Sequence, residues 1–145
     1  MNLNKNILSL SYLGLIPFYF FSIISIFEDY NFFIDIFFLY SVIIICFLSG
    51  SLWMKLMILP KQNNNAFFRI LSVTFPLMAM ISELFVSYSL KVIIYVLIYI
   101  LIYICDKKTA AHQMPAYIRM RFFLTGNVIL THLILLYTIF TYGIF

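Results

Sequence analysis

Long apolar runs, separated by short polar segments, make up almost the whole chain. A helix needs about 20 mostly apolar residues to cross a hydrocarbon core of ~30 Å. The runs predict an all-α protein, a polytopic bundle of five transmembrane helices in a single domain covering residues 1–145. The predicted spans are about residues 7–27, 32–59, 66–87, 89–105 and 122–145.

The first run begins like a signal peptide, because Lys5 precedes an apolar segment that starts at Ile7. The segment continues to Phe27, however, and is followed by Glu28 and Asp29 without a cleavage site of small residues. We therefore expect a retained first span. The second predicted span is closed by proline and then by a polar loop: Pro60 and Lys61–Asn65.

The stretch from Ala66 to Cys105 is too long for one span. As a single helix it would measure about 60 Å, twice the thickness of the hydrocarbon core. Glu83 and Lys91 lie near its middle, on either side of Ser87. The stretch is therefore predicted to form a tight hairpin of two spans, whose charged side chains reach toward the membrane interfaces.

The composition supports a membrane protein over a soluble one. Hydrophobic residues make up 65% of the chain and charged residues 10%, whereas soluble domains have roughly 45–50% and ~25%. A soluble domain of this size could not bury so many apolar side chains. The net charge of +4 comes from basic residues scattered between apolar runs, so no nucleic-acid partner is expected.

The basic residues also predict an orientation, because Lys and Arg favour the cytoplasmic side. With five spans and the N-terminus inside, the inner segments hold eight of the nine basic residues: Lys5, Lys55, Lys61, Arg69, Lys107, Lys108, Arg119 and Arg121. Lys91 is left outside. The acids run the other way, with only Asp106 inside. The C-terminus is then outside, and an alkaline phosphatase fused after Phe145 is expected to be active.

The predicted inner loop from Asp106 to Arg121 is the most basic part of the chain, with Lys107, Lys108, Arg119 and Arg121. These side chains can set the topology and meet anionic lipid headgroups. Docking of a partner protein is the alternative.

His132 is the one imidazole placed near the centre of a predicted span. Ionisable groups at membrane depth are candidates for function. The imidazole could handle protons or bind a haem iron or metal ion, or it could be a neutral group bonded to a neighbouring helix. The other histidine, His112, falls in the inner loop, which makes joint ligation awkward. No cofactor, metal site or catalytic set is predicted.

Two polar helix faces are also candidates. Tyr95, Tyr99 and Tyr103 recur every four residues and share one face of the fourth span with Tyr88. The fifth span offers a second face: Asn127, Thr131, Thr138 and Tyr142. We expect the two faces to meet, with His132 at the margin, either as packing or as the lining of a solute path.

Small residues and prolines mark further packing positions. Gly14 shares a stripe of the first span with three serines: Ser11, Ser22 and Ser25. Cys46 and Gly50 lie four residues apart in the second span, and small residues allow helices to approach closely. Cys46 and Cys105 are expected to be apolar fillers. Pro17 and Pro76 lie inside predicted spans, where proline bends a helix.

Short motifs resemble those of an uncharacterised family of small membrane proteins that includes transmembrane protein 69. Leu13–Phe18 resembles the family's opening, and Phe47–Trp53, with its Ser49-Gly50-Ser51, resembles the second-span motif. Pro76, Asp106 and the run Arg119–Thr125 follow in the family's order. Two positions depart from it: Leu52 stands where the family often has His, and Tyr117 alone remains of an aromatic pair. The resemblance implies a bacterial or mitochondrial inner membrane and no particular activity.

Two function classes remain open from the sequence. A non-enzymatic accessory or assembly protein, acting through other membrane proteins, fits the short loops and the lack of a catalytic set. A transporter or channel-like protein for a small solute or lipid is the alternative. An enzyme has little support from the residues.

Overall fold

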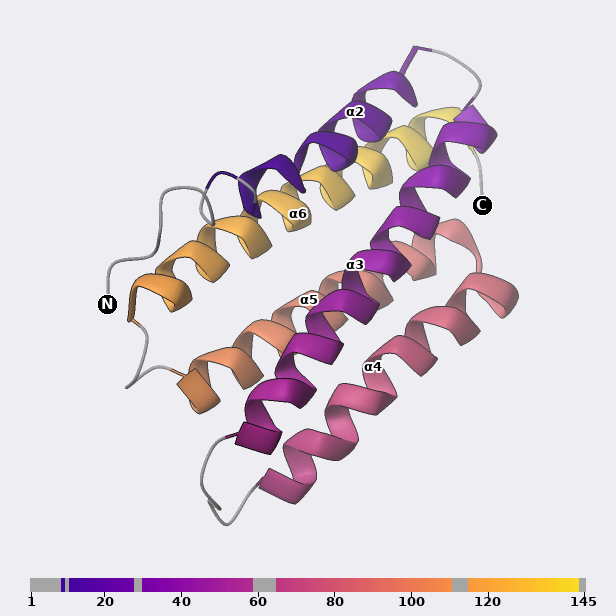
Figure 1. Ribbon diagram of the computed structural model, residues 1–145. Helices are drawn as coiled ribbons and strands as arrows, with labels where there is room; N and C mark the ends of the chain where they lie inside the picture. The colour runs from indigo at the N-terminus through magenta and orange to yellow at the C-terminus, as the bar shows by residue number, and fades with distance from the viewer. Residues whose placement is uncertain (1–8, 10, 28–29, 59–64, 111–114, 144–145) are drawn as a thin grey trace.

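The computed structural model describes residues 9, 11–27, 30–58, 65–110 and 115–143. Across these residues the chain is all-α, as predicted. Its described helices, drawn in Figure 1, are α2 (Ile16–Ile24), α3 (Tyr30–Ile58), α4 (Asn65–Phe85), α5 (Tyr88–Ala110) and α6 (Pro115–Tyr142). Several predicted features lie outside the described residues: Lys5, Glu28, Asp29, Pro60, Lys61–Asn64 and His112.

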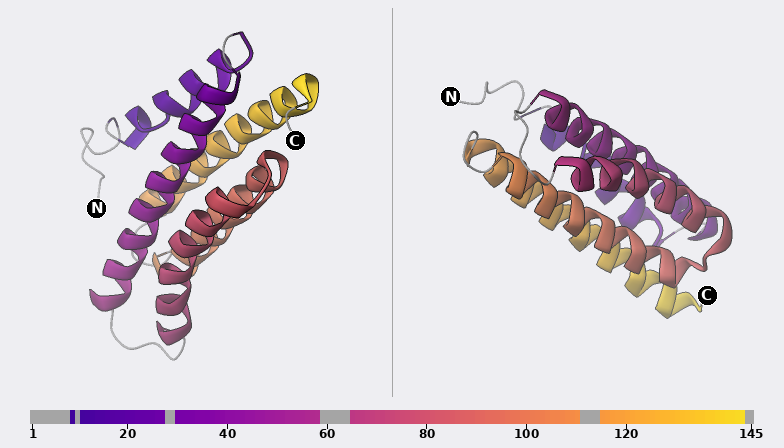
Figure 2. Two further views of the ribbon diagram at one scale, coloured as in Figure 1. Left: turned by 90° about the vertical axis from the view of Figure 1, so that its right-hand side faces the viewer. Right: turned by 90° about the horizontal axis from the view of Figure 1, so that it is seen from below.

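The long helices run side by side as two antiparallel pairs, α3 with α4 and α5 with α6 (Figure 1). Helices α3 and α5 lie at the centre, because they also contact each other and most of the remaining helices. Helix α2 packs against α3 and α6. Seen from two further directions in Figure 2, the helices form one elongated bundle.

The break between α4 and α5 falls at Val86 and Ser87, inside the segment for which the sequence predicts a hairpin. Helix α4 keeps Pro76 in its interior. At 1.5 Å per residue, α4 and α5 are each about 30–35 Å long, which suits a hydrocarbon core of ~30 Å. The length limit of the membrane therefore explains why this stretch is divided.

The described helix of the N-terminal segment is shorter than the predicted span. Ser11–Leu13 are helical, Gly14 and Leu15 form a turn, and α2 begins at Ile16 with Pro17 in its first turn. The described apolar helix, Ser11–Ile24, is too short to cross a bilayer, whereas four helices are long and apolar enough: Asn31–Ile58, Ala66–Phe85, Tyr88–Thr109 and Pro115–Tyr142.

Helix α6 begins seven residues earlier than the predicted fifth span, and α5 ends five residues later than the predicted fourth. Pro115 fits the first turn of α6, where its missing N–H is no loss. The predicted inner loop is therefore mostly helical: Lys107 and Lys108 lie in α5, and Arg119 and Arg121 lie in α6. Because α6 already includes Arg121, this side chain lies in the helix and is buried.

Apolar side chains cover the outside of the bundle as well as its interior. Phe47, Ile58, Leu84 and Phe85 are each at least 70% exposed. Large exposed apolar patches mark contact with another apolar phase or partner. With four helices of spanning length, this surface identifies a multi-pass membrane protein.

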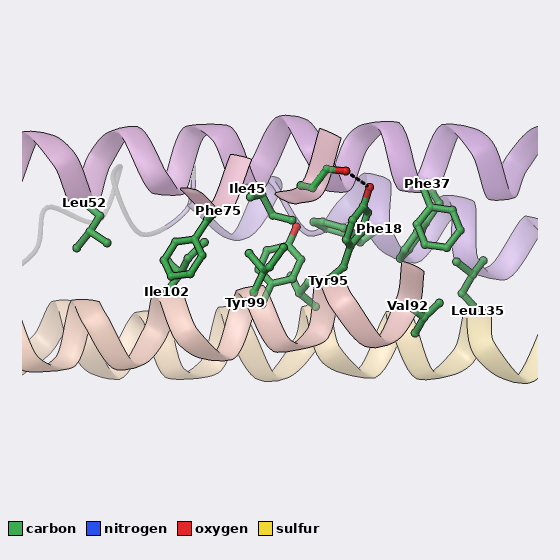
Figure 3. Packing of buried hydrophobic residues seen from close by; sticks show 14 of the residues in the cluster. Phe18, Phe37, Ile45, Leu52, Phe75, Val92, Tyr95, Tyr99, Ile102 and Leu135 are labelled. Atoms are coloured by element: carbon green, nitrogen blue, oxygen red, sulfur yellow. Dashed lines mark hydrogen bonds between the residues drawn. The ribbon is translucent and has the colours of Figure 1, made fainter. Parts of the chain in front are cut away.

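Aromatic rings fill the core between α2, α3 and α5. Phe18, Phe37, Tyr95 and Tyr99 are almost completely buried, and Figure 3 shows them projecting into the space between the helices. The Phe18 and Phe37 rings meet edge to face at 5.4 Å, a preferred aromatic geometry. Leu52, at the position where the resembled family often has His, is also fully buried.

Candidate functional site

A buried carboxylate joins three helices at one end of the bundle. Asp106 of α5 has a fully buried side chain. Lys55 of α3 donates from Nζ to Oδ1 at 2.6 Å. Arg121 of α6 donates from Nε and Nη2 to Oδ2 at 2.8 and 2.7 Å. We call these three residues and Tyr117 the Asp106 cluster, and the end of the bundle that holds them the Asp106 end.

Tyr117 completes the Asp106 cluster from α6. Its hydroxyl accepts a hydrogen bond from Lys55 Nζ and donates to Asp106 Oδ2 at 3.3 Å. Its ring lies under both cations, 4.0 Å from Lys55 Nζ and 5.9 Å from the Arg121 guanidinium carbon. An aromatic face attracts cations at such distances.

The Asp106 cluster holds two cations against one anion. A buried carboxylate is tolerated only when charged partners and hydrogen bonds replace its hydration. Asp106 also lies near the C-terminal end of α5, where the helix dipole disfavours negative charge. The two cations therefore also offset the unfavourable interaction of the carboxylate with the dipole. The arrangement ties α3, α5 and α6 together.

A second polar centre surrounds His132 of α6, which is completely buried. Its Nδ1 lies 2.8 Å from the carbonyl oxygen of Val128, and its Nε2 lies 3.3 Å from Ser41 Oγ of α3. A carbonyl only accepts, so Nδ1 carries the proton; in the neutral form of the ring, Nε2 then accepts from the Ser41 hydroxyl. Tyr99 of α5 donates to the Ser41 carbonyl at 3.2 Å.

Aromatic rings enclose the His132 imidazole. The ring centroids of Phe37, Tyr99, Phe18 and Tyr95 lie 4.8, 5.6, 5.9 and 6.4 Å from it. These rings come from α2, α3 and α5, so four helices meet at His132. In the part of the chain that the structure describes, no group of three or more His, Cys, Asp or Glu side chains could hold a metal ion. Metal ligation by His132 therefore gains no support.

The opposite end of the bundle, which we call the Glu83 end, holds a third polar group. Lys91 of α5 lies 3.3 Å from Glu83 of α4. Tyr95 donates to Glu83 Oε2 at 2.8 Å and approaches the Ala79 carbonyl at 3.1 Å. Tyr88 donates to Asp35 Oδ1 of α3 at 2.8 Å. These contacts join α3, α4 and α5.

Among the described residues, the two predicted polar faces meet at His132, whose ring lies near the rings of Tyr95 and Tyr99. The hydroxyls of Tyr95 and Tyr99 reach α4 and α3. Asn127 accepts from Tyr19 of α2 at 2.6 Å, and Tyr142 donates to the Ile26 carbonyl at 2.9 Å. Thr131 is buried and bonds within its own helix, to the Val128 carbonyl. Asn127 and Tyr142 of α6 thus bond to α2 and the residues after it. His132 is the residue of α6 that contacts the tyrosine face of α5.

The predicted small-residue contacts hold for the first segment and fail for the second. Ser22 and Ser25 are fully buried, and the Gly14 carbonyl accepts from Tyr40 of α3 at 2.9 Å. Cys46 is exposed, and a Cβ added to Gly50 would meet nothing within 4 Å. The reason is the orientation of α3 about its own axis. Other residues of the same helical turns face the core, including Ser49.

The remaining candidate, Trp53, lies on the outer surface and is 41% exposed. Lys107, Lys108 and Arg119 are exposed, whereas Arg121 is buried in the Asp106 cluster. Of the four basic residues of the predicted inner loop, three therefore lie on the surface and one is part of a buried ion pair.

Sequence reasoning missed the partners of the buried groups: Lys55, Asp106, Tyr117, Ser41 and Tyr40. Two signals were present. Asp106 is the single acid in the basic part of the chain, and Tyr117 precedes Arg121 by four residues, the spacing of neighbours on one helix face.

The fold and the site define a multi-pass helical membrane protein with a closed, hydrogen-bonded core. The sequence matches the family described as a protein of unknown function, DUF3429, over residues 3–137. Because this match spans most of the chain, the protein belongs to the DUF3429 family. No curated protein and no solved structure matches the chain.

Proposed function

We propose that the protein is a non-enzymatic accessory or assembly protein that acts through other proteins of its membrane. The observation that carries the proposal is that the buried carboxylate, imidazole and phenol groups described above are bonded within the bundle. Asp106, His132, Tyr95 and Tyr99 are buried, and each is bonded to a neighbouring helix or to its own. Such groups stiffen a bundle more readily than they serve a substrate.

The outer surface supports the same proposal. Helix α3 turns Cys46 and Gly50 outward beside Phe47. Small residues on a membrane-facing surface allow another helix to approach closely. This surface gives a partner protein a place to pack that the chain itself leaves open.

We also propose an inner-membrane location with the Asp106 end facing the cytoplasm or matrix. The described Asp106 end carries one acid and six basic residues: Lys55, Arg69, Lys107, Lys108, Arg119 and Arg121. The described Glu83 end carries Lys91 against Asp35 and Glu83. This imbalance supports an inside position for the Asp106 end, and the resemblance to a family that includes transmembrane protein 69 supports the choice of membrane. The C-terminus is then outside, and the N-terminus is inside if the first segment, whose described helix is shorter than a span, also crosses.

A transporter or channel-like protein for a small solute or lipid is the alternative. The strongest candidate lining for a solute path was the tyrosine face with His132. Helix kinks at Pro17 and Pro76 could have opened and closed such a path. Tyr99 and His132 are closed in by packed rings, and Pro17 begins α2 and so does not bend a continuous span. These features favour the accessory protein.

Native electrophoresis with mass spectrometry tests the proposal. The tagged protein, expressed from its own locus, is extracted in mild detergent and its complexes are quantified. We expect an unrelated membrane protein at a constant ratio, and a lower abundance of that partner's complex when the gene is deleted. Migration as a homo-oligomer, combined with solute flux in proteoliposomes that the empty vesicles lack, would favour the transporter.

A further inference from the structure

A lipid-facing groove lies between α3 and α4 at the Asp106 end. It has a volume of about 500 Å³ and is lined by Trp53, Ala66, Arg69, Ile70, Val73 and Thr74. Five of these residues come from α4, at the spacing of one helix face. From Ala66 to Thr74 the groove follows α4 for about 12 Å. We call it the Trp53–Arg69 groove.

The walls of the groove are apolar except at one end. Ile70 and Val73 are 66% and 50% exposed, so they face the surroundings of the bundle. Thr74 donates its hydroxyl to the Ile70 carbonyl at 2.9 Å, so its polar atom is already bonded within the helix. Arg69, one turn from the start of α4, provides the only charged side chain of the lining.

The charge around the groove favours an anionic occupant. The described Asp106 end has six basic residues, and its one acid is buried and paired with Lys55 and Arg121. Basic residues at a membrane surface attract anionic lipids. Trp53, which is 41% exposed, suits the level of the headgroups.

We propose that the Trp53–Arg69 groove binds one anionic phospholipid. Its phosphate lies against the Arg69 guanidinium, and one acyl chain lies along Ile70 and Val73 toward the middle of the membrane. Ala66 leaves space beside the headgroup because its side chain is a single methyl group. This site is separate from the proposed protein partner, because it requires only the bilayer.

The single tryptophan of the chain makes the site directly measurable, because Trp53 is that tryptophan. The protein is reconstituted in vesicles of phosphatidylcholine with a fixed fraction of phosphatidylglycerol. Bromine atoms on the acyl chains of one lipid or the other quench an indole on contact. We expect brominated phosphatidylglycerol to quench Trp53 more strongly than its share of the bilayer predicts, with an apparent preference of about fivefold for one arginine contact.

Two pairs of variants separate the groove from general surface charge. Arg69→Gln should remove the preference, whereas Arg119→Gln, which removes an exposed charge from α6, should retain it. Val73→Phe should fill the groove and reduce quenching by both lipids. Ile81→Phe, on the exposed surface of α4 but outside the groove, should leave it unchanged.

Size-exclusion chromatography checks that each variant remains folded. Equal quenching by the two lipids in the unmodified protein would overturn the proposal. An equal loss of preference in Arg69→Gln and Arg119→Gln would also overturn it, because bulk attraction would then explain the binding. Unchanged quenching in Val73→Phe would show that the groove is not the place of contact.

Discussion

Asp106 is a residue whose burial depends on partners from two other helices. Its side chain is inaccessible, while those of Lys55 and Arg121 are 25% and 7% exposed. Arg121 supplies two N–H groups to one carboxylate oxygen, and Lys55 donates to the other oxygen. A network of this kind is stable when complete, because every buried charge has a partner, and costly when one member is missing.

Replacing Asp106 by alanine should therefore destabilise the protein by about 3 kcal/mol or more, because it leaves the buried Arg121 without its anion. The free energy of unfolding can be measured by far-ultraviolet circular dichroism in mixed micelles during titration with a denaturing detergent. Asp35→Ala is the matched control, since it removes an exposed carboxylate whose hydrogen bond from Tyr88 is also exposed. Its cost should stay below about 1 kcal/mol. Similar losses for the two variants would contradict the structural role of the Asp106 cluster.

His132 and Ser41 should show energetic coupling. Each of His132→Leu and Ser41→Ala removes the bond between Nε2 and Oγ, so the double variant should lose less stability than the sum of the single ones. We expect a coupling of about 0.5–1.5 kcal/mol, the range for such bonds between membrane helices. The same unfolding titration provides the four values of the cycle. Additive losses would mean that the 3.3 Å contact contributes nothing.

At the residue scale, the sequence predicted which groups matter better than it predicted their partners. His132, Tyr95 and Tyr99 were singled out as candidate polar positions, and all three are hydrogen-bonded. The partners of the two tyrosine hydroxyls were not predicted, because helical periodicity defines a face without showing which neighbour it meets. Lys55 and Ser41 belong to a helix that is apolar on nearly all sides, so no polar stripe marked them.

At the scale of elements, length was the more reliable guide. The hydrocarbon thickness alone required a break between Ala66 and Cys105, and the chain breaks at Val86 and Ser87. The first segment was predicted less well, because its continuous apolar composition does not indicate the turn that interrupts the helix. Gly14 and Leu15 form a turn before Pro17, so α2 starts at Ile16 and the regular helix is short.

The turn before α2 is supported from α3, so Tyr40→Phe should loosen it. The variant removes the hydroxyl that bonds to the Gly14 carbonyl at 2.9 Å. Loss of one such bond, worth about 1 kcal/mol, should speed amide hydrogen exchange about fivefold around residues 11–18. Exchange in α5 should not change. Tyr12→Phe is the control, because this side chain is 42% exposed; equal acceleration in both variants would assign the effect to the general loss of a hydroxyl.

At the scale of the whole molecule, two features act together. The apolar outer surface confines the bundle to a membrane, and the charges at its two ends favour one orientation. Among the described residues, six bases and one acid give +5 at the Asp106 end, and one base and two acids give −1 at the Glu83 end. The antiparallel pairing of α3 with α4 and α5 with α6 brings together charges that are far apart in the chain.

Labelling of single cysteines tests this orientation. In a variant without Cys46 and Cys105, Ser87→Cys places a thiol at the exposed turn between α4 and α5, and Lys108→Cys places one near the end of α5. A membrane-impermeant maleimide added to intact bacterial cells should label the first variant. It should label the second only after the membrane is opened, because the Lys and Arg excess favours an inside position for the Asp106 end. Labelling of both variants after permeabilisation serves as the positive control. The reverse pattern in intact cells would mean that the basic end faces outward and that the proposed orientation is wrong.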